Sequence, residues 1–333
     1  LALAGSEDAI SRLVRRERGR WSVEHGPIRA SRLKQLPRRD WTVLVQDTNF
    51  FSPAAARLLA CFDFIPHARI DDVMASYAVD GGGVGPHVDS YDVFLLQGRG
   101  ERRWRISRQR DHAFLPGLDL RVLRRFEPEA EWVLRAGDML YLPPGVAHEG
   151  VALGECMTWS IGFRAPDQAQ AAEAFLDFLR DRPAAPRRYR DPGARPAVHP
   201  GAIPAALVAH VERAAASIRW SRADVREFAG RFLAEPKGHA YFTPPTRPLG
   251  RRAFEGRARR EGLALDPRSR FFFSGTMFFL NGERIDAPAA ARPMLRRLAD
   301  ARVFAPGSAA PREFWDLAHA WHGRGFVRIG RQA

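Results

Sequence analysis

Two histidines and one aspartate in the first half of the chain have the types and the spacing of a metal site. His87 and Asp89 are two residues apart, so on an extended strand both side chains point to one face. His148 ends a second segment, 137–148, which predicts a buried strand followed by a Pro-Gly turn. Two histidines and a carboxylate leave three positions open on iron(II), enough for a bidentate oxoacid and dioxygen. The pattern predicts that these three residues form a catalytic iron(II) site. The alternative is that both histidines make structural hydrogen bonds.

A second group that could do chemistry is Arg102, which lies on a predicted strand. Arg102 alternates in phase with Trp104 and Ile106, so it shares the apolar face of that strand. A buried guanidinium needs an anion, because an unpaired buried charge is very costly. The distal carboxylate of 2-oxoglutarate is a partner that suits the arginine fork. We therefore expect Arg102 to bind this cosubstrate, and an internal ion pair with Asp or Glu is the alternative.

Two serines and a glycine run lie near these residues in the sequence. We expect the hydroxyl of Ser76, on the predicted strand 74–79, to assist the same carboxylate, although a plain strand serine is an equal alternative. Ser160, in segment 158–163, is a weaker candidate. The glycine run 81–85 lacks the Gly-Lys-Ser/Thr ending of a phosphate-binding loop, and no helix is predicted after it. We interpret the run as letting the backbone approach the site closely.

The elements that must position these residues fall into three regions. Residues 1–165 contain short apolar runs broken by Gly and Pro, for example 41–45 and 139–142. Short strands at such spacing predict an all-β sandwich or barrel. Within it, segments 92–97 and 101–107 are expected to form a hairpin around the glycines at 98 and 100.

Residues 166–235 predict helices. Asp167 is expected to cap the first, a second spans about 205–220, and Ser221 with Asp224 resembles a capping box that opens a third. A Pro- and Arg-rich link, 183–204, lies between the first two. Apolar stripes on these helices predict a core or dimer contact, and they comprise Phe175, Phe178, Val208 and Val211.

Residues 236–333 predict a small mixed unit of helices and hairpins. Its expected elements are a tight hairpin over 271–280, a type I′ turn at Asn281-Gly282, helices near 292–300 and 312–322, and a final strand at 326–329. Helices combined with small hairpins are typical of a winged-helix-like module.

Composition adds expectations about partners and compartment. The net charge is +14, which favours an anionic neighbourhood such as nucleic acid or a ribosome. Only Lys34 and Lys237 are lysines, however, and the arginines are spread along the whole chain, so genome base composition is an alternative cause. A weak RNA contact is the resulting expectation. Cys61 and Cys156 are expected to be reduced core thiols in a cytoplasmic protein, and no apolar run is long enough for a membrane span.

At these residues the chain resembles the bacterial ribosomal oxygenases of the JmjC (cupin) superfamily. The resemblance rests on segments that include the metal and arginine motifs, namely 70–74, 81–87, 91–94, 97–98, 102–105, 143–145, 148–150, 162–166 and 281–286. It implies an α+β chain with a double-stranded β-helix (JmjC/cupin jelly roll) core over 1–165. A helical dimerisation region over 166–235 and a C-terminal winged-helix domain over 236–333 would follow. It also implies a homodimer.

The resemblance further implies an activity. Iron(II) would bind His87, Asp89 and His148, and 2-oxoglutarate would bind Arg102 with help from Ser76. Oxidative decarboxylation to succinate and carbon dioxide would be coupled to hydroxylation of an arginine β-carbon in protein sixteen of the large ribosomal subunit. Asp80 and Thr158 depart from the family pattern and put the substrate residue in doubt. The same chemistry on a ribosomal histidine stays open. So does a non-catalytic metal cupin that binds ribosomal components, which would have no need for a buried Arg102.

Overall fold

The computed structural model describes residues 1–182, 188–190, 193 and 195–330. The chain divides into two compact units. The first consists mainly of Leu1–Ala165 and includes Asp266–Arg268, and the second consists of Pro166–Leu265 and Ser269–Ile329. Among the described residues, no helix is both long and apolar enough to cross a membrane.

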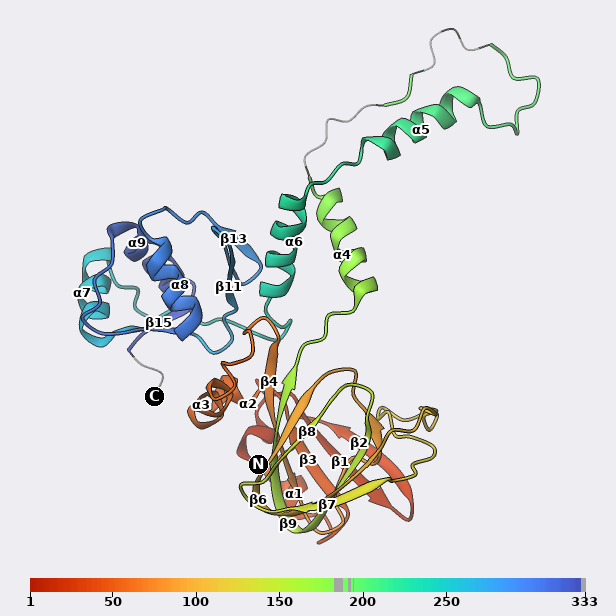
Figure 1. Cartoon of the computed structure of the whole chain (residues 1–333), viewed down its shortest axis with the longest axis vertical. Coiled ribbons are helices and arrows are strands. Elements are labelled where there is room, and N and C mark those ends of the chain that lie inside the picture. Colours follow the sequence, from red (N-terminus) through yellow and green to blue (C-terminus); the bar gives the residue numbers. More distant parts are fainter. Residues whose placement is uncertain (183–187, 191–192, 194, 331–333) are drawn as a thin grey trace. The chain divides into compact units, whose positions relative to one another are not determined.

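The first unit is built on one antiparallel sheet (Figure 1). Its strands are β1 Ser11–Glu17, β2 Arg20–His25, β3 Trp41–Val45, β4 Ile70–Ala78, β5 His87–Val88, β6 Val93–Ser107, β7 Ala130–Leu134, β8 Met139–Leu142 and β9 Ala147–Phe163. They follow the order β2-β1-β3-β4-β9-β6-β7, while β5 pairs with β9 and β8 pairs with β6. Short helical segments complete the unit, namely η1 Ala2–Gly5, α1 Ala30–Lys34, α2 Thr48–Phe51 and α3 Pro53–Ala60.

The hairpin expected over 92–107 is wrong. This segment is the single strand β6, which pairs with β9 along most of its length. Register shifts between Gln97 and Arg99 and between Arg99 and Glu101 mark local irregularities of the kind that β-bulges produce. Gly100 has φ +66°, and a Cβ there would collide with the carbonyl of Glu155 on β9. The glycines therefore allow two strands to approach each other closely and do not reverse the chain. In the sequence, glycines mark both kinds of structure in the same way.

Apolar side chains pack on both faces of β6 and β9. One face holds a buried cluster of Val93, Leu95, Trp104 and Leu142. The other face packs against α3 and the residues after it through a second cluster, whose buried members are Ala55, Phe62, Ile70, Val73, Ile161 and Phe163. Because successive side chains of a strand point to opposite faces, the two clusters show which side chains of β6 lie on the same face as Trp104.

The second unit begins with three helices, α4 Gln168–Arg180, α5 Ala205–Ser217 and α6 Arg222–Ala234. The side chain of Asp167 accepts hydrogen bonds from the first backbone N–H groups of α4, as expected. Ser221 and Asp224 form the predicted capping box of α6. Part of the predicted link 183–204 lies outside the described residues.

The remainder of the second unit holds the largest apolar core. Its elements are α7 Arg251–Glu261, β10 Leu263–Leu265, β11 Phe271–Ser274, β12 Met277–Leu280, β13 Glu283–Ile285, α8 Arg292–Ala301, β14 Val303–Phe304, α9 Arg312–Gly323 and β15 Val327–Ile329. Asn281 and Gly282 both have positive φ, +50° and +82°, which confirms the type I′ turn. The helix α7 was not predicted, because only Phe254 and Ala258 of its residues are buried and charged residues make up most of the rest. Phe254 packs with Phe314 and Trp315 in the core.

Candidate metal centre

The structure brings His87, Asp89 and His148 together in the first unit. Their ligand atoms all lie within 4.8 Å of one another. The Oδ2 atom of Asp89 is 4.0 Å from Nε2 of His87 and 3.7 Å from Nε2 of His148. The two imidazole centroids are 4.2 Å apart. His87 and Asp89, two residues apart, therefore point to the same side, as strand geometry predicts, and His148 lies beside them.

Strand pairing explains how the second histidine reaches the first. The two-residue strand β5 runs antiparallel to the start of β9, with His87 directly opposite His148 and Val88 opposite Ala147. Gly83 allows this approach, because a Cβ at that position would be 2.5 Å from the carbonyl oxygen of Gly150 on β9. The interpretation of the glycine run as a close-approach segment is confirmed at this residue.

Backbone carbonyls set the proton positions on both rings. Nδ1 of His87 lies 3.0 Å from the carbonyl of Gly85, and Nδ1 of His148 lies 3.0 Å from the carbonyl of Val146. Each carbonyl needs an N–H donor, so Nδ1 carries the proton and Nε2 keeps its lone pair facing Asp89. Burial and the neighbouring His87 lower the pKa of His148 to about 3. The ring is therefore neutral near pH 7, which is the state that binds a metal. The donor set fits a divalent metal ion.

Arg102 is buried next to Ser76. Its side chain is on the same face of β6 as Trp104, with 5% of Arg102 exposed, and its Nη1 donates to Oγ of Ser76 at 3.2 Å. Its Nε and Nη2 atoms are buried and have no hydrogen-bond partner among the described residues. No Asp or Glu of the described chain forms an ion pair with it, so the structure does not support the internal ion-pair alternative. The guanidinium has unused donors in an enclosed position.

The arginine and the metal cluster share one face of the sheet. Across the β6–β9 pair, Arg102 is opposite Ala152, Trp104 is opposite Gly150 and Ile106 is opposite His148. Residues directly opposite in an antiparallel pair project to the same face. The indole of Trp104 lies over Gly150, where a Cβ would be 2.7 Å from the ring, and its centroid is 6.1 Å from that of His148. Trp104 thus lies along this face between the histidine and the arginine.

Two buried polar residues support Ser76, namely Thr158, which the sequence singled out only as a departure from the family pattern, and Gln97, to which it gave no role. The hydroxyl of Thr158 donates to Oε1 of Gln97 at 2.8 Å, and the hydroxyl of Ser76 donates to the carbonyl of Thr158 at 3.4 Å. Gln97 is fully buried and Thr158 is 1% exposed. The signal for Gln97 was present, because it continues the alternation of the buried Val93 and Leu95.

The other residues named from the sequence fall outside this cluster. Ser160 lies on β9 opposite Leu95, and its hydroxyl has no hydrogen-bond partner among the described residues. His319 and His322, which are three residues apart on α9, bond to the backbone carbonyls of Leu249 and Val327 and are far from this cluster in the sequence. The prediction of two core thiols is half wrong. Both cysteines are free, but Cys61 is exposed and only Cys156 is buried.

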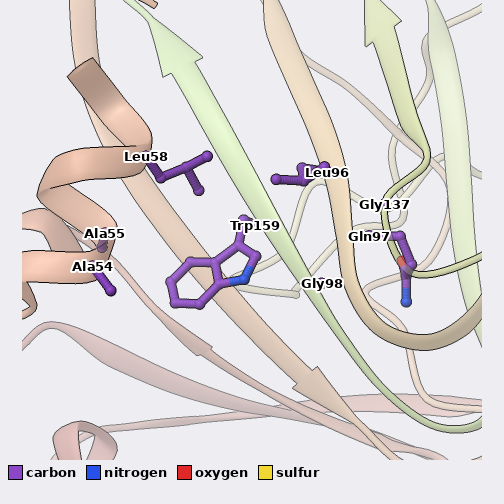
Figure 2. Close-up of a pocket in the computed structure, with 8 residues that line it drawn as sticks. All are labelled: Ala54, Ala55, Leu58, Leu96, Gln97, Gly98, Gly137 and Trp159. Atoms are coloured by element: carbon purple, nitrogen blue, oxygen red, sulfur yellow. The ribbon is translucent and has the colours of Figure 1, made fainter. Parts of the chain in front are cut away.

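A small pocket on the opposite face of the sheet lacks chemically active groups (Figure 2). It has a volume of about 350 Å³ and lies between α3 and the strands β6 and β9. Leu58, Leu96 and Trp159 line it, together with Gln97 and small residues, and none of the three clustered side chains His87, Asp89 and His148 does. The candidate catalytic residues therefore lie on the other face, which carries His148 and Arg102.

Comparison with known proteins finds relatives for both units of the chain. A JmjC domain matches residues 57–171, and a ROXA-like winged helix matches residues 217–327. The ribosomal protein uL16 3-hydroxylase of Escherichia coli is 34% identical over 301 residues, which are 89% of this chain and 79% of that protein. The structure of the E. coli ribosomal oxygenase YcfD in complex with cobalt and 2-oxoglutarate is 31% identical, with a TM-score of 0.80. That alignment covers 98% of this chain and 88% of that one.

A shorter match concerns eukaryotic relatives. The bifunctional lysine-specific demethylase and histidyl-hydroxylase NO66 of Dictyostelium discoideum is 39% identical over 74 residues, 21% of this chain and 14% of that protein. The longer matches confirm the predicted fold class, a JmjC/cupin core followed by a winged helix. The chain belongs to the family of JmjC-domain ribosomal oxygenases that includes the E. coli uL16 3-hydroxylase.

Proposed function

We propose that this protein is an iron(II)- and 2-oxoglutarate-dependent oxygenase that hydroxylates ribosomal protein uL16 on the β-carbon of an arginine. The observation that carries the proposal is the pairing of two features on one sheet face. One is a His-Asp-His cluster, and the other is a buried arginine with unused donors. The relative that matches most of the chain is named a uL16 3-hydroxylase, and position 3 of an amino acid is its β-carbon.

In this proposal the chain holds both cofactors through its own side chains. His87, Asp89 and His148 would hold iron(II), which supplies the oxygen activation that is coupled to decarboxylation of 2-oxoglutarate. Arg102 would meet the distal carboxylate with its free Nε–H and Nη2–H groups, and Ser76 would keep the guanidinium oriented. A cobalt and 2-oxoglutarate complex of the YcfD relative supports this assignment.

The residues around the cluster would control water and geometry. Trp104 is 4% exposed and covers the sheet between His148 and Arg102, so it would exclude water from the space where the cosubstrate extends. The backbone carbonyls of Gly85 and Val146 would keep both imidazoles oriented with Nε2 toward the metal. A dry and rigid site favours reaction of the bound substrate over side reactions with water.

Two alternatives make different predictions. A ribosomal histidine is the second candidate substrate, because the partial relative NO66 is named a histidyl-hydroxylase. A non-catalytic metal cupin is disfavoured, since it gives no reason for the unpaired donors of the buried Arg102. The metal cluster itself does not separate the first alternative from the arginine proposal.

The proposal extends to assembly, domains and place of action. We propose that residues 1–165 form the oxygenase domain, 166–235 a dimerisation region and 236–333 the winged-helix domain, in a homodimer. Exposed apolar side chains on the helices support this, among them Leu176, Val208 and Val211. A substrate that belongs to the ribosome supports action in the cytoplasm.

Intact-mass analysis of ribosomal proteins tests the proposal. Cells that carry the gene should yield uL16 that is heavier by one oxygen atom than uL16 from cells that lack it. Fragmentation should locate the added oxygen on an arginine. Oxygen on a histidine of another ribosomal protein would favour the second candidate. No mass difference in any ribosomal protein would contradict the proposed function.

A further inference from the structure

A second cleft in the first unit lies at the β1–β2 hairpin and is rich in arginine. Its volume is about 880 Å³, and its lining includes Arg16, Arg18, Arg20 and Arg39 together with the indole of Trp21. Arg18 lies in the turn of the hairpin, Arg20 is the first residue of β2, and Arg16 lies on β1 opposite Trp21. Nothing in the proposed reaction uses these residues.

Both walls of this cleft connect to the segment that leads to the metal centre. The indole of Trp21 packs on Gly85, where a Cβ would be 2.8 Å from Cζ2 of the ring. The carbonyl of Gly85 is the one that holds His87. On the other wall, Arg39 forms a 3.0 Å ion pair with Asp80, the residue before the glycine run. The cleft is therefore a neighbour of the active site and not a remote surface.

The cleft carries an excess of positive charge, with four arginines against two acidic residues. Within the described part of the chain, Arg16, Arg18 and Arg20 form no ion pair with Asp or Glu. Glu17 and Asp40 also line the cleft. The carboxylate of Glu17 pairs with Arg15, and within the described residues Asp40 forms no ion pair with the cleft arginines, which outnumber the two acidic residues. The guanidinium of Arg16 lies 5.4 Å from the centroid of the Trp21 ring, directly across the hairpin. Unpaired arginines beside an aromatic ring form a surface suited to an anion that also carries flat rings.

We propose that this cleft binds RNA through its phosphates, next to the catalytic site. The arginine fork matches phosphate geometry, and an aromatic ring in a basic groove is the arrangement that binds single strands. The substrate protein itself does not explain the cleft, because ribosomal proteins are generally basic and the arginines would repel them. RNA held by the substrate would supply the matching charge. This inference rests on the proposed function only for the source of the RNA.

Fluorescence anisotropy with a labelled oligouridylate and the full-length protein tests the cleft directly. We expect Arg18→Ala/Arg20→Ala to raise the Kd at low salt about 10-fold or more. Losing two phosphate contacts should also reduce the slope of log Kd against log salt by about 1.4, at roughly 0.7 for each contact to a single strand. Arg29→Ala/Arg57→Ala is the matched control. Both control residues are exposed, lie outside the cleft lining and form no ion pair within the described residues.

The possible outcomes separate the cleft from other surfaces and partners. Equal RNA affinity in the two double variants would overturn the proposal and place binding elsewhere, for example on the winged helix. Absence of RNA binding to the wild-type protein at low salt would also overturn it. A glutamate-rich peptide that binds the cleft as tightly as the oligouridylate would show that the cleft takes acidic protein.

A second readout keeps this inference separate from the proposed function. Conversion of 2-oxoglutarate to succinate without substrate should be the same in Arg18→Ala/Arg20→Ala as in the wild type, because neither residue belongs to the proposed cofactor site. Normal succinate formation by a wild-type protein that does not bind RNA would contradict the RNA-binding proposal alone. RNA binding by a wild-type protein that forms no succinate from 2-oxoglutarate would contradict the oxygenase proposal alone.

Discussion

A buried guanidinium is stable only if anions or acceptors meet its donors, and Arg102 keeps two donors unmet within the described residues. Leaving a buried charged group without a partner costs several kcal/mol in general. A chain that holds such a group next to a His-Asp-His cluster is organised to receive an anion there. The five-carbon diacid 2-oxoglutarate suits both groups, because one of its carboxylates can bind a metal at the cluster while the other binds the Arg102 guanidinium.

Replacement of Arg102 is the first test at the scale of single residues. Arg102→Ala should raise the KM for 2-oxoglutarate by about 30- to several-thousand-fold, since losing one partner of a buried charge pair costs about 2–5 kcal/mol. Iron binding should persist because the proposed ligands are untouched. Steady-state succinate formation against 2-oxoglutarate concentration gives the KM.

The neighbouring arginine is the control for this variant. Arg103 alternates to the other face, and its side chain is 38% exposed, with Nε 3.9 Å from Oε2 of Glu131. Arg103→Ala should leave the KM almost unchanged. If Arg103→Ala weakened cofactor use while Arg102→Ala did not, the assignment of the cosubstrate to this face would be wrong.

Ser76 offers a finer test of the same pocket. Its hydroxyl accepts from Arg102 and donates to the carbonyl of Thr158. Ser76→Ala should raise the KM for 2-oxoglutarate about 10- to 150-fold, the effect of about 1.5–3 kcal/mol for one hydrogen bond to a charged group. Ser160→Ala removes a hydroxyl without a described partner and should have little effect. A larger effect from Ser160 would reverse the ranking of the two serines.

Local sequence patterns identified the candidate site residues, but they did not identify the backbone and side-chain groups that hold those residues in place. Spacing in a strand was enough to pair His87 with Asp89, and alternation was enough to bury Arg102. The carbonyls of Gly85 and Val146 could not be predicted, because every residue has a carbonyl and only the folded backbone aims one at an imidazole. The hydrogen bond between Thr158 and Gln97 crosses two strands, and no local pattern reports such a pair.

At the scale of elements, the irregular stretch of β6 predicts a measurable steric effect. Gly100 has φ +66° and would place a Cβ against the β9 backbone, whereas Gly117 has φ +72° with open space around it. Gly100→Ala should lower the Tm of the first unit by several degrees more than Gly117→Ala does. Both variants carry the backbone strain of a positive φ, of about 1–3 kcal/mol, but only the first adds a clash. Equal melting shifts in thermal unfolding would show that the strands separate easily at this point.

Other elements show why local sequence decides some structures and not others. Capping residues and the Asn281-Gly282 turn were predicted correctly, because their chemistry acts within a few residues. The hairpin at 92–107 was wrong, because a glycine pair marks both turns and bulges, and only the partner strand β9 decides between them. The helix α7 was missed since its burial comes from the distant α9 and not from its own polar sequence.

At the scale of the whole molecule, the proposed homodimer depends on apolar helix surface. Phe175 and Phe178 contact Phe228 of the same chain, with centroids 5.1 and 5.7 Å from it, so part of the predicted stripe is satisfied internally. Val208 and Val211 on α5 stay 43% and 60% exposed. A short helix with exposed β-branched residues gains stability from a partner.

Charge placed on that surface should dissociate the dimer. Val211→Asp should shift the mass from light scattering toward that of one chain at micromolar concentration. Ala206→Asp, on a different face of α5, adds the same charge and should leave the dimer intact. A wild-type protein that is a monomer under these conditions would contradict the proposed assembly.

The most direct test of the central claim joins the metal cluster to the product. Purified protein with iron(II), 2-oxoglutarate and unmodified uL16 should add one oxygen atom to the β-carbon of an arginine, as located by tandem mass spectrometry. Asp89→Ala should add none, although its Tm without metal should match the wild type, because the carboxylate is not part of the core. The account is contradicted if the wild type adds no oxygen to uL16, or if Asp89→Ala adds it at the wild-type rate.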